Sequence, residues 1–130
     1  RYIVGPVFRP EVIAACHERD VAVMPGCFSP TEILSAWEAG ADMVKVFPAT
    51  ALGPTYIRDV LAPLPHVKLM PTGGVSLENA GDWIRAGSAA IGVGSAMVEA
   101  RLVASGDFAA IALRAARFVE AVRAARERQS

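Results

Sequence analysis

The chain has 130 residues, of which 53% are hydrophobic and 20% charged, and its 13 basic side chains balance 13 acidic ones. This balance argues against a nucleic-acid or membrane-surface partner, because both need a basic footprint, and no apolar run approaches the roughly 18 residues of a transmembrane helix. The length is that of one domain with its own core, which we expect to span residues 1–130.

Five apolar, strand-like runs recur along the chain at nearly constant spacing. They begin at Tyr2, Ala22, Met43, Val67 and Ala90, which are 20, 21, 24 and 23 residues apart. Helical patterns follow them over Glu11–Arg19, Thr31–Ala39, Thr55–Leu61, Leu77–Ala86 and Asp107 to about Arg126. This alternation predicts five βα units with a parallel sheet, and therefore the α/β class. The units fit either an open sheet or five-eighths of a (β/α)8 barrel.

Helix-capping residues support this division. Ser29-Pro30-Thr31-Glu32 fits a capping box with Ser29 at the N-cap, and Ser76 is expected to open the helix that follows it. Gly40 and Gly87 come directly after two helices, where a left-handed glycine commonly ends a helix.

The unusual residues gather at the carboxyl end of each strand and in the turn after it. They are Pro25-Gly26, Phe47-Pro48-Ala49, Pro71-Thr72-Gly73-Gly74 and Gly92-Val93-Gly94-Ser95. In barrels and in open α/β sheets alike, this edge is where ligands bind.

Lys45 is the sharpest candidate for chemistry. It interrupts Met43–Phe47, a run that otherwise predicts a strand buried on both faces. Burial lowers the pKa of a lysine, and the neutral amine can then attack a carbonyl carbon. The structural alternative is a lysine that reaches solvent or pairs with a carboxylate. Lys68 also precedes a proline by three residues, but it follows Pro65-His66-Val67, so we expect it at the surface.

Two glycine-containing turns form a second candidate constellation. Gly73-Gly74 and Gly94-Ser95 let backbone N–H groups approach a ligand closely and surround an anion. Barrel enzymes often hold phosphate on their last two βα loops, so these turns predict a phosphate site. Each turn alone is also an ordinary connection.

The cysteines and histidines predict no metal or redox centre. Cys16 and Cys27 lack the spacing of such sites, and the chain has only His17 and His66. We expect reduced structural thiols in a cytoplasmic protein without a cofactor. Trp37 and Trp83 are expected to be packing residues.

At these residues the chain resembles the bacterial 2-dehydro-3-deoxy-6-phosphogluconate (KDPG) aldolases, which often also cleave 4-hydroxy-2-oxoglutarate (KHG). The similar segments are Val23–Gly26, Val44–Ala49, Leu52–Ile57, Pro71–Val75 and Gly92–Ser95. The resemblance implies a (β/α)8 barrel, a homotrimer, and cleavage of a 2-oxo acid phosphate to pyruvate and glyceraldehyde 3-phosphate without metal or cofactor.

The resemblance also implies residue roles. Lys45 would form the Schiff base with the substrate, and Phe47 would line the pocket. Thr72 and Gly73-Gly74 would contact substrate, while Gly94-Ser95 would hold phosphate. Thr72 favours the gluconate-type enzyme over the galactonate-type, whose loop tends to be apolar there.

The chain matches strands four to eight of that barrel, and we therefore expect it to be the C-terminal part. The family's general acid/base glutamate and carboxylate-binding arginine lie in the first two units and have no matching position. Glu11, Glu32 and Glu38 are not substitutes, because they lie on helices expected outside the sheet. Other readings are a different enzyme on a phosphate-binding barrel, such as an epimerase or a relative of thiamin-phosphate synthase, and a non-catalytic phosphate-binding fragment.

Overall fold

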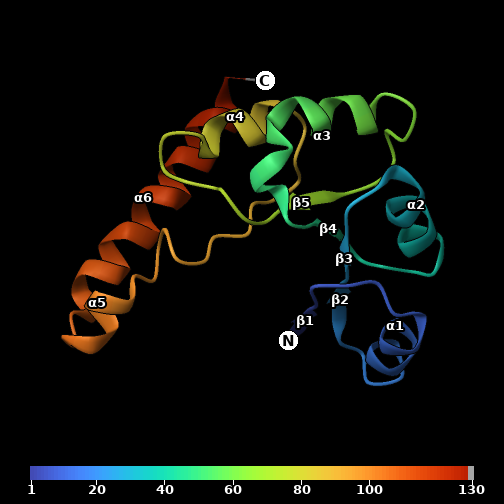
Figure 1. Cartoon of the computed structure of the whole chain (residues 1–130), viewed down its shortest axis with the longest axis horizontal. Helices are drawn as coiled ribbons and strands as arrows, with labels where there is room; N and C mark the ends of the chain where they lie inside the picture. Colours follow the sequence, from blue (N-terminus) through green and yellow to red (C-terminus); the bar gives the residue numbers. More distant parts are fainter. Residues whose placement is uncertain (129–130) are drawn as a thin grey trace.

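The computed structural model describes residues 1–128, in which strands and helices alternate (Figure 1). The strands are β1 (Tyr2–Val4), β2 (Ala22–Met24), β3 (Gly26–Cys27), β4 (Val44–Val46) and β5 (Leu69–Pro71). The helices are α1 (Pro10–His17), α2 (Pro30–Glu38), α3 (Gly53–Leu61), α4 (Ala80–Arg85), α5 (Ala100–Ala104) and α6 (Phe108–Glu127), with a 3₁₀ turn η1 (Ala49–Ala51).

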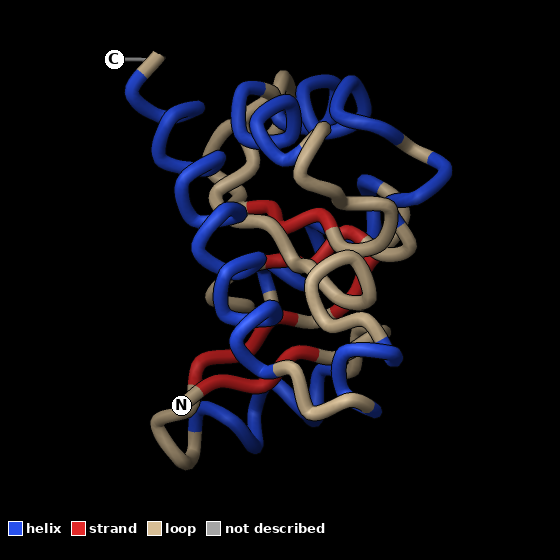
Figure 2. Tube along the Cα trace, turned by 90° about the vertical axis from the view of Figure 1, so that its left-hand side faces the viewer, coloured by secondary structure: helices blue, strands red, loops and turns tan. Residues whose placement is uncertain are grey.

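All strand pairs are parallel, and their order follows the chain. β1 pairs with β2, β3 with β4 and β4 with β5, while β2 and β3 are two parts of one extended segment interrupted at Pro25. The helices lie in an arc outside the strands (Figures 1 and 2). A strand order that never reverses is typical of a barrel wall and differs from a doubly wound sheet.

The strand expected from Ala90 is the main correction to the predicted elements. The structure has only an isolated parallel bridge there, between Thr72 and Gly92. Two backbone hydrogen bonds, from Ala89 N–H to the carbonyl of Leu69 and from Gly92 N–H to that of Pro71, keep the segment beside β5. Both bonds join the segment to β5, and a single bridge is too short to count as a strand.

The core lies between the strands and the helices. Val44 and Val46 of β4 are fully buried and face the helices, where Ile33 of α2 and Ile57 of α3 are equally buried. Burying such side chains contributes about 1.5–3 kcal/mol each relative to exposure. Lys45 on the opposite face is only half-buried. The expectation that this strand is buried on both faces is therefore wrong, because the helices of residues 1–128 lie on the outer side of the strands.

The predicted caps are confirmed except one. Ser29 caps α2 in a complete capping box with Glu32, and Gly40 and Gly87 have positive φ after α2 and α4. Ser76 does not open a helix, because α4 begins at Ala80.

A turn centred on Asn79 explains the late start of α4. Its side-chain oxygen accepts the N–H of Ser76 at 2.8 Å, and its amide donates to the carbonyl of Gly74 at 2.8 Å. The segment before α4 is therefore held as a turn. The short helix α5 was not predicted.

Apolar surface remains open at both ends of the arc. In β1, Tyr2, Ile3 and Val4 are 67%, 46% and 41% exposed, because β1 pairs on one side only. At the other end, a groove of about 430 Å³ runs between residues 90–97 and α6. No helix within residues 1–128 is long and apolar enough to cross a membrane.

Candidate active site

Lys45 is the central residue of β4, between β3 and β5 in the sheet. Its register partners are Gly26 on β3 and Met70 on β5, and its N–H donates to the carbonyl of Pro25 at 2.9 Å. Gly26 has no side chain, and a Cβ there would collide with the backbone of Pro6. The β1–α1 connection therefore approaches β3 closely beside the register partner of Lys45.

The surroundings of Lys45 favour a reactive amine. Burial lowers the pKa of Lys45, and no carboxylate pairs with its ammonium within the described part of the chain. The Nζ atom lies 4.3 Å from the ring centroid of Phe47, within cation–π distance. This contact directs the side chain toward the carboxyl end of β4, where the predicted ligand edge lies.

Lys68 has a different environment. It immediately precedes β5 and is exposed. The prediction of a surface lysine at the amino end of that strand is confirmed. The two lysines of the chain therefore differ in both depth and position along their strands.

The loops after β4 and β5 are tied together by backbone bonds. Ala49 N–H donates to the carbonyl of Thr72 at 2.9 Å, and Thr72 N–H donates to that of Val46 at 3.0 Å. The Phe47–Pro48 peptide between them is cis. The lysine strand and the glycine loop therefore form one connected edge.

Thr50 extends this connection. Cβ atoms placed on Gly73 and Gly74 would lie 3.1 Å from its Oγ1 and 3.0 Å from its Cα, and both glycines have positive φ. A side chain at either glycine would be strained and crowded. Thr50 was not predicted as a site residue, because only the fold brings it to Gly73. Its place directly after Phe47-Pro48-Ala49 was the one available signal.

A pocket of about 410 Å³ joins the predicted ligand residues. Its lining comprises Phe47, Thr72, Gly73, Gly74, Val75, Ser76, Gly92, Gly94, Ser95 and Ala96. All six predicted substrate-binding residues are among them. Phe47 links this pocket to Lys45, which lies below its ring. The predicted grouping at one sheet edge is therefore confirmed, while the residues' individual roles stay predictions.

The hydroxyl of Thr72 is a notable polar group in this pocket. Its Oγ1 is shielded from solvent and has no hydrogen-bond partner among residues 1–128. An unpaired buried hydroxyl costs about 1–3 kcal/mol, which a ligand's hydrogen bond would offset.

Gly94 and Ser95 form an exposed turn on the far side of the pocket. The carbonyl of Gly94 accepts the N–H groups of Met97 and Val98, each at 3.0 Å. The turn thus carries its own backbone bonds, and no cation is among the pocket's lining residues. An anion here would depend on backbone N–H groups and on the Ser95 hydroxyl.

Cys27 is a structural thiol, as expected. It is 3% exposed, and burial raises its pKa to about 12, with a smaller contribution from Glu32. Its Sγ lies 3.4 Å from the carbonyl oxygen of Glu32. A thiol with this pKa stays protonated and is not a nucleophile. Within residues 1–128 no three His, Cys, Asp or Glu side chains are grouped to bind a metal.

Comparison with known proteins shows the family of the chain. A family model described as KDPG and KHG aldolase matches residues 1–113. The chain belongs to the KDPG and KHG aldolase family. Its curated relatives include the 2-dehydro-3-deoxy-phosphogluconate aldolase of Treponema pallidum, which is 39% identical over 112 residues, or 85% of this chain and 53% of the relative.

Solved structures of KDPG and KHG aldolases have the same fold. One described as native KDPGal is 38% identical, with a TM-score of 0.87 over 97% of this chain and 60% of that one. The KDPG aldolase of Legionella pneumophila, with pyruvate captured at low pH as a covalent carbinolamine intermediate, is 26% identical. Its TM-score is 0.76 over 85% of this chain and 54% of that one. The chain thus spans about half the length of the curated relatives it matches.

Proposed function

We propose that this protein is a class I aldolase that cleaves KDPG to pyruvate and glyceraldehyde 3-phosphate through a Schiff base on Lys45. KHG, which would give pyruvate and glyoxylate, is a second substrate under this proposal. The main support for this proposal is the environment of Lys45. Its amine is half-buried, has a lowered pKa and lies against the ring of Phe47, which lines the pocket. The relatives' names support the same chemistry.

The proposed reaction begins with the neutral amine. The Nζ of Lys45 attacks the C2 carbonyl of the substrate, and the carbinolamine loses water to give an iminium. The C3–C4 bond then breaks, its electron pair moves into the iminium to form an enamine, and the C4 hydroxyl loses its proton as the aldehyde forms. Protonation of the enamine at C3 and hydrolysis release pyruvate and free Lys45.

The pocket residues fit the two ends of such a substrate. Phe47 packs over the reacting lysine, and Thr72 contacts a hydroxyl of the substrate chain through its unpaired Oγ1. The N–H groups of Gly73-Gly74 and Gly94-Ser95 surround the phosphate at the distal end. This assignment follows the pocket's geometry and the family resemblance.

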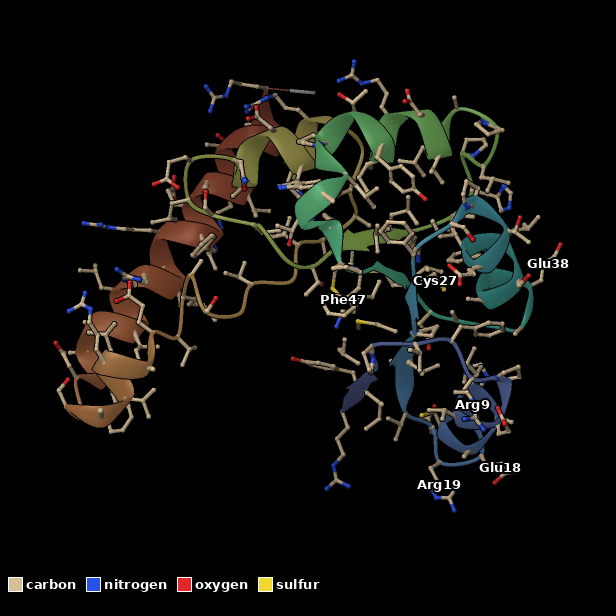
Figure 3. All side chains as sticks on the ribbon, in the orientation of Figure 1. Arg9, Glu18, Arg19, Cys27, Glu38 and Phe47 are labelled. Carbon is tan, nitrogen blue, oxygen red and sulfur yellow. The ribbon has the colours of Figure 1, made fainter. Side chains whose placement is uncertain are left out.

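We propose that the general acid/base and the carboxylate-binding arginine come from βα units outside these 130 residues. Three glutamates of this chain either have other partners or point away from the strands. Glu11 is paired with Arg9, Glu32 accepts two backbone N–H groups of the α2 capping box, and Glu38 points outward from α2 (Figure 3). The exposed β1 and the groove beside α6 offer two surfaces on which further units would complete a barrel.

We further propose a homotrimer, as the family resemblance implies. Large apolar side chains are exposed around α5, among them Val103 at 49% and Phe108 at 67%. Light scattering on the full-length protein tests this, and a monomeric mass would contradict it.

The galactonate-type aldolase is the second candidate, because the structure described as native KDPGal matches at high TM-score. Parallel assays on the gluconate and galactonate epimers and on KHG would separate these activities. Faster turnover of the gluconate epimer is expected. Tight binding of phosphate esters without turnover would instead favour a non-catalytic phosphate-binding protein.

A further inference from the structure

In the sequence, the arginines of α6 all fit a solvent-exposed helix face. In the structure, Arg114 differs from this pattern, because it is partly buried and bonded to other residues. The Arg114 side chain is 29% exposed, and its Nη1 donates to the carbonyl of Ala96 at 3.1 Å. The same Nη1 forms an ion pair with Glu99. Arg114 thus contacts both sides of the segment that connects the Gly94-Ser95 turn to α5.

Glu99 contacts two arginines, Arg114 and Arg101. Its other carboxylate oxygen accepts a 2.6 Å hydrogen bond from Nε of Arg101, and its own side chain is 30% exposed. Arg101 and Arg114 both lower its pKa, with Arg101 the larger cause. The carboxylate is therefore ionised at neutral pH and fixes the direction of the Arg114 guanidinium.

Arg114 supplies the side-chain hydrogen bond that reaches this turn from α6, and Ala96 and Met97 also pack against the core. Both Gly94 and Ser95 are exposed, and a Cβ placed on Gly94 would meet no atom within 4 Å. The hydrogen bonds that Gly94 accepts come from Met97 and Val98, within the same segment. Ala96, whose carbonyl Arg114 holds, itself lines the pocket.

We infer that Arg114 is a positioning residue that fixes the Gly94–Ala96 turn on α6 so that the turn can bind the phosphate-monoester end of the substrate. This inference rests on the proposed function for the identity of the ligand. An ordered turn loses less conformational entropy when it binds an anion, so its affinity is higher. Arg114 need not touch the ligand, since its charge is neutralised by Glu99.

Arg114 should affect only the phosphate-binding end of the active site. Loosening the turn weakens binding of the phosphate group and leaves Schiff-base formation at Lys45 unaffected. A substrate without phosphate, such as KHG, is equally unaffected. A general loss of stability would instead impair both substrates together.

The test compares Arg114→Leu with Arg117→Leu in the full-length protein. Arg117 is the matched control, because it lies on the same helix, is exposed and has no hydrogen bond or ion pair in the described structure. For Arg114→Leu we expect KM for the phosphorylated substrate to rise about tenfold, the effect of losing one charge-assisted hydrogen bond. The kcat, the KM for KHG and trapping of pyruvate on Lys45 should stay unchanged, and Arg117→Leu should match the wild type.

A conservative variant guards against misfolding. Arg114→Lys keeps the charge but not the planar fork, so its KM should lie between those of the wild type and Arg114→Leu. An equal rise in KM for both substrates, an unchanged KM, or the same effect from Arg117→Leu would overturn the inference.

Amide hydrogen exchange separates this inference from the proposed function. If Arg114 fixes the turn, the amides of Met97 and Val98 exchange faster in Arg114→Leu and not in Arg117→Leu, whatever reaction the protein catalyses. Unchanged exchange would overturn the inference. A wild-type protein that neither traps pyruvate nor cleaves either substrate would overturn the proposed function alone.

Discussion

Gly92 and Thr72 face each other across a parallel bridge, and the side chain of Thr72 fills the space that a Cβ on Gly92 would need. A Cβ at that position would fall well inside van der Waals contact with Oγ1 of Thr72. Glycine at position 92 therefore allows the threonine hydroxyl to lie at the pocket wall. The segment around Gly92 thus affects the position of the Thr72 side chain, although Gly92 itself has no side chain.

Replacing Gly92 by alanine should displace the Thr72 side chain. We expect a loss of about 1–3 kcal/mol in the free energy of unfolding, measured with urea, as for other overpacked sites. Gly94→Ala is the control and should change stability by less than about 0.5 kcal/mol, because its Cβ would meet open space. Adding Thr72→Ala to Gly92→Ala should restore part of the loss. Equal effects of the two single alanine substitutions would contradict the packing described here.

Thr72→Val tests the unpaired hydroxyl. Valine has the same shape, so the protein should be unchanged or about 1 kcal/mol more stable, because no hydrogen bond within the described structure is lost. Preference for the gluconate over the galactonate epimer should fall. Marked destabilisation in thermal unfolding would mean that the hydroxyl has a structural partner.

The titration of Lys45 should differ from that of an ordinary lysine. Only the neutral amine reacts with acetic anhydride, and burial lowers the Lys45 pKa from the usual 10.5, so its labelling should reach a plateau below that pH. The unfolded chain then binds the proton more tightly, and stability rises with pH between the lowered pKa and 10.5. Mass spectrometry of the labelled peptide follows the reaction, and Lys45→Met should abolish this pH dependence of stability.

Phe47→Leu refines the same measurement. A ring face in cation–π contact stabilises the ammonium, so its removal should lower the Lys45 pKa further. Phe8→Leu is a control, because Phe8 has no such contact with the lysine in the described structure. A rise in the Lys45 pKa after Phe47→Leu would contradict the cation–π contact.

Ser29→Ala should cost about 1 kcal/mol of stability, since Ser29 Oγ accepts the Glu32 N–H at the start of α2. Ser76→Ala should cost less than half of that, because Ser76 caps no helix. Urea unfolding of the two variants compares them directly. Equal losses would contradict the corrected start of α4.

What the sequence could predict was local. The capping box at Ser29 and the left-handed Gly40 and Gly87 depend on neighbours within a few residues, and the structure agrees with each. The strand expected at Ala90–Gly94 depended on an apolar run alone and is reduced to one bridge. The length of a strand depends on the strands that pair with it, and an apolar run in the sequence does not identify those partners.

The missed site residues follow the same rule. Thr50 lies against Gly73 and Gly74, and Arg114 reaches back to Ala96, across 18 residues or more of sequence. Nothing in the local pattern distinguishes Arg114 from the exposed Arg117. The grouping of Phe47 with the two glycine turns was predictable, because the carboxyl ends of parallel strands meet at one edge.

The central claim is that Lys45 is the Schiff-base nucleophile, and borohydride reduction in the presence of pyruvate tests it most directly. The 130 residues contain two lysines, Lys45 and Lys68, and peptide mass spectrometry of the reduced full-length protein distinguishes them. We predict one reduced pyruvyl adduct, on Lys45, and none in Lys45→Met. An adduct on Lys68, or no adduct on the folded protein, would contradict the account.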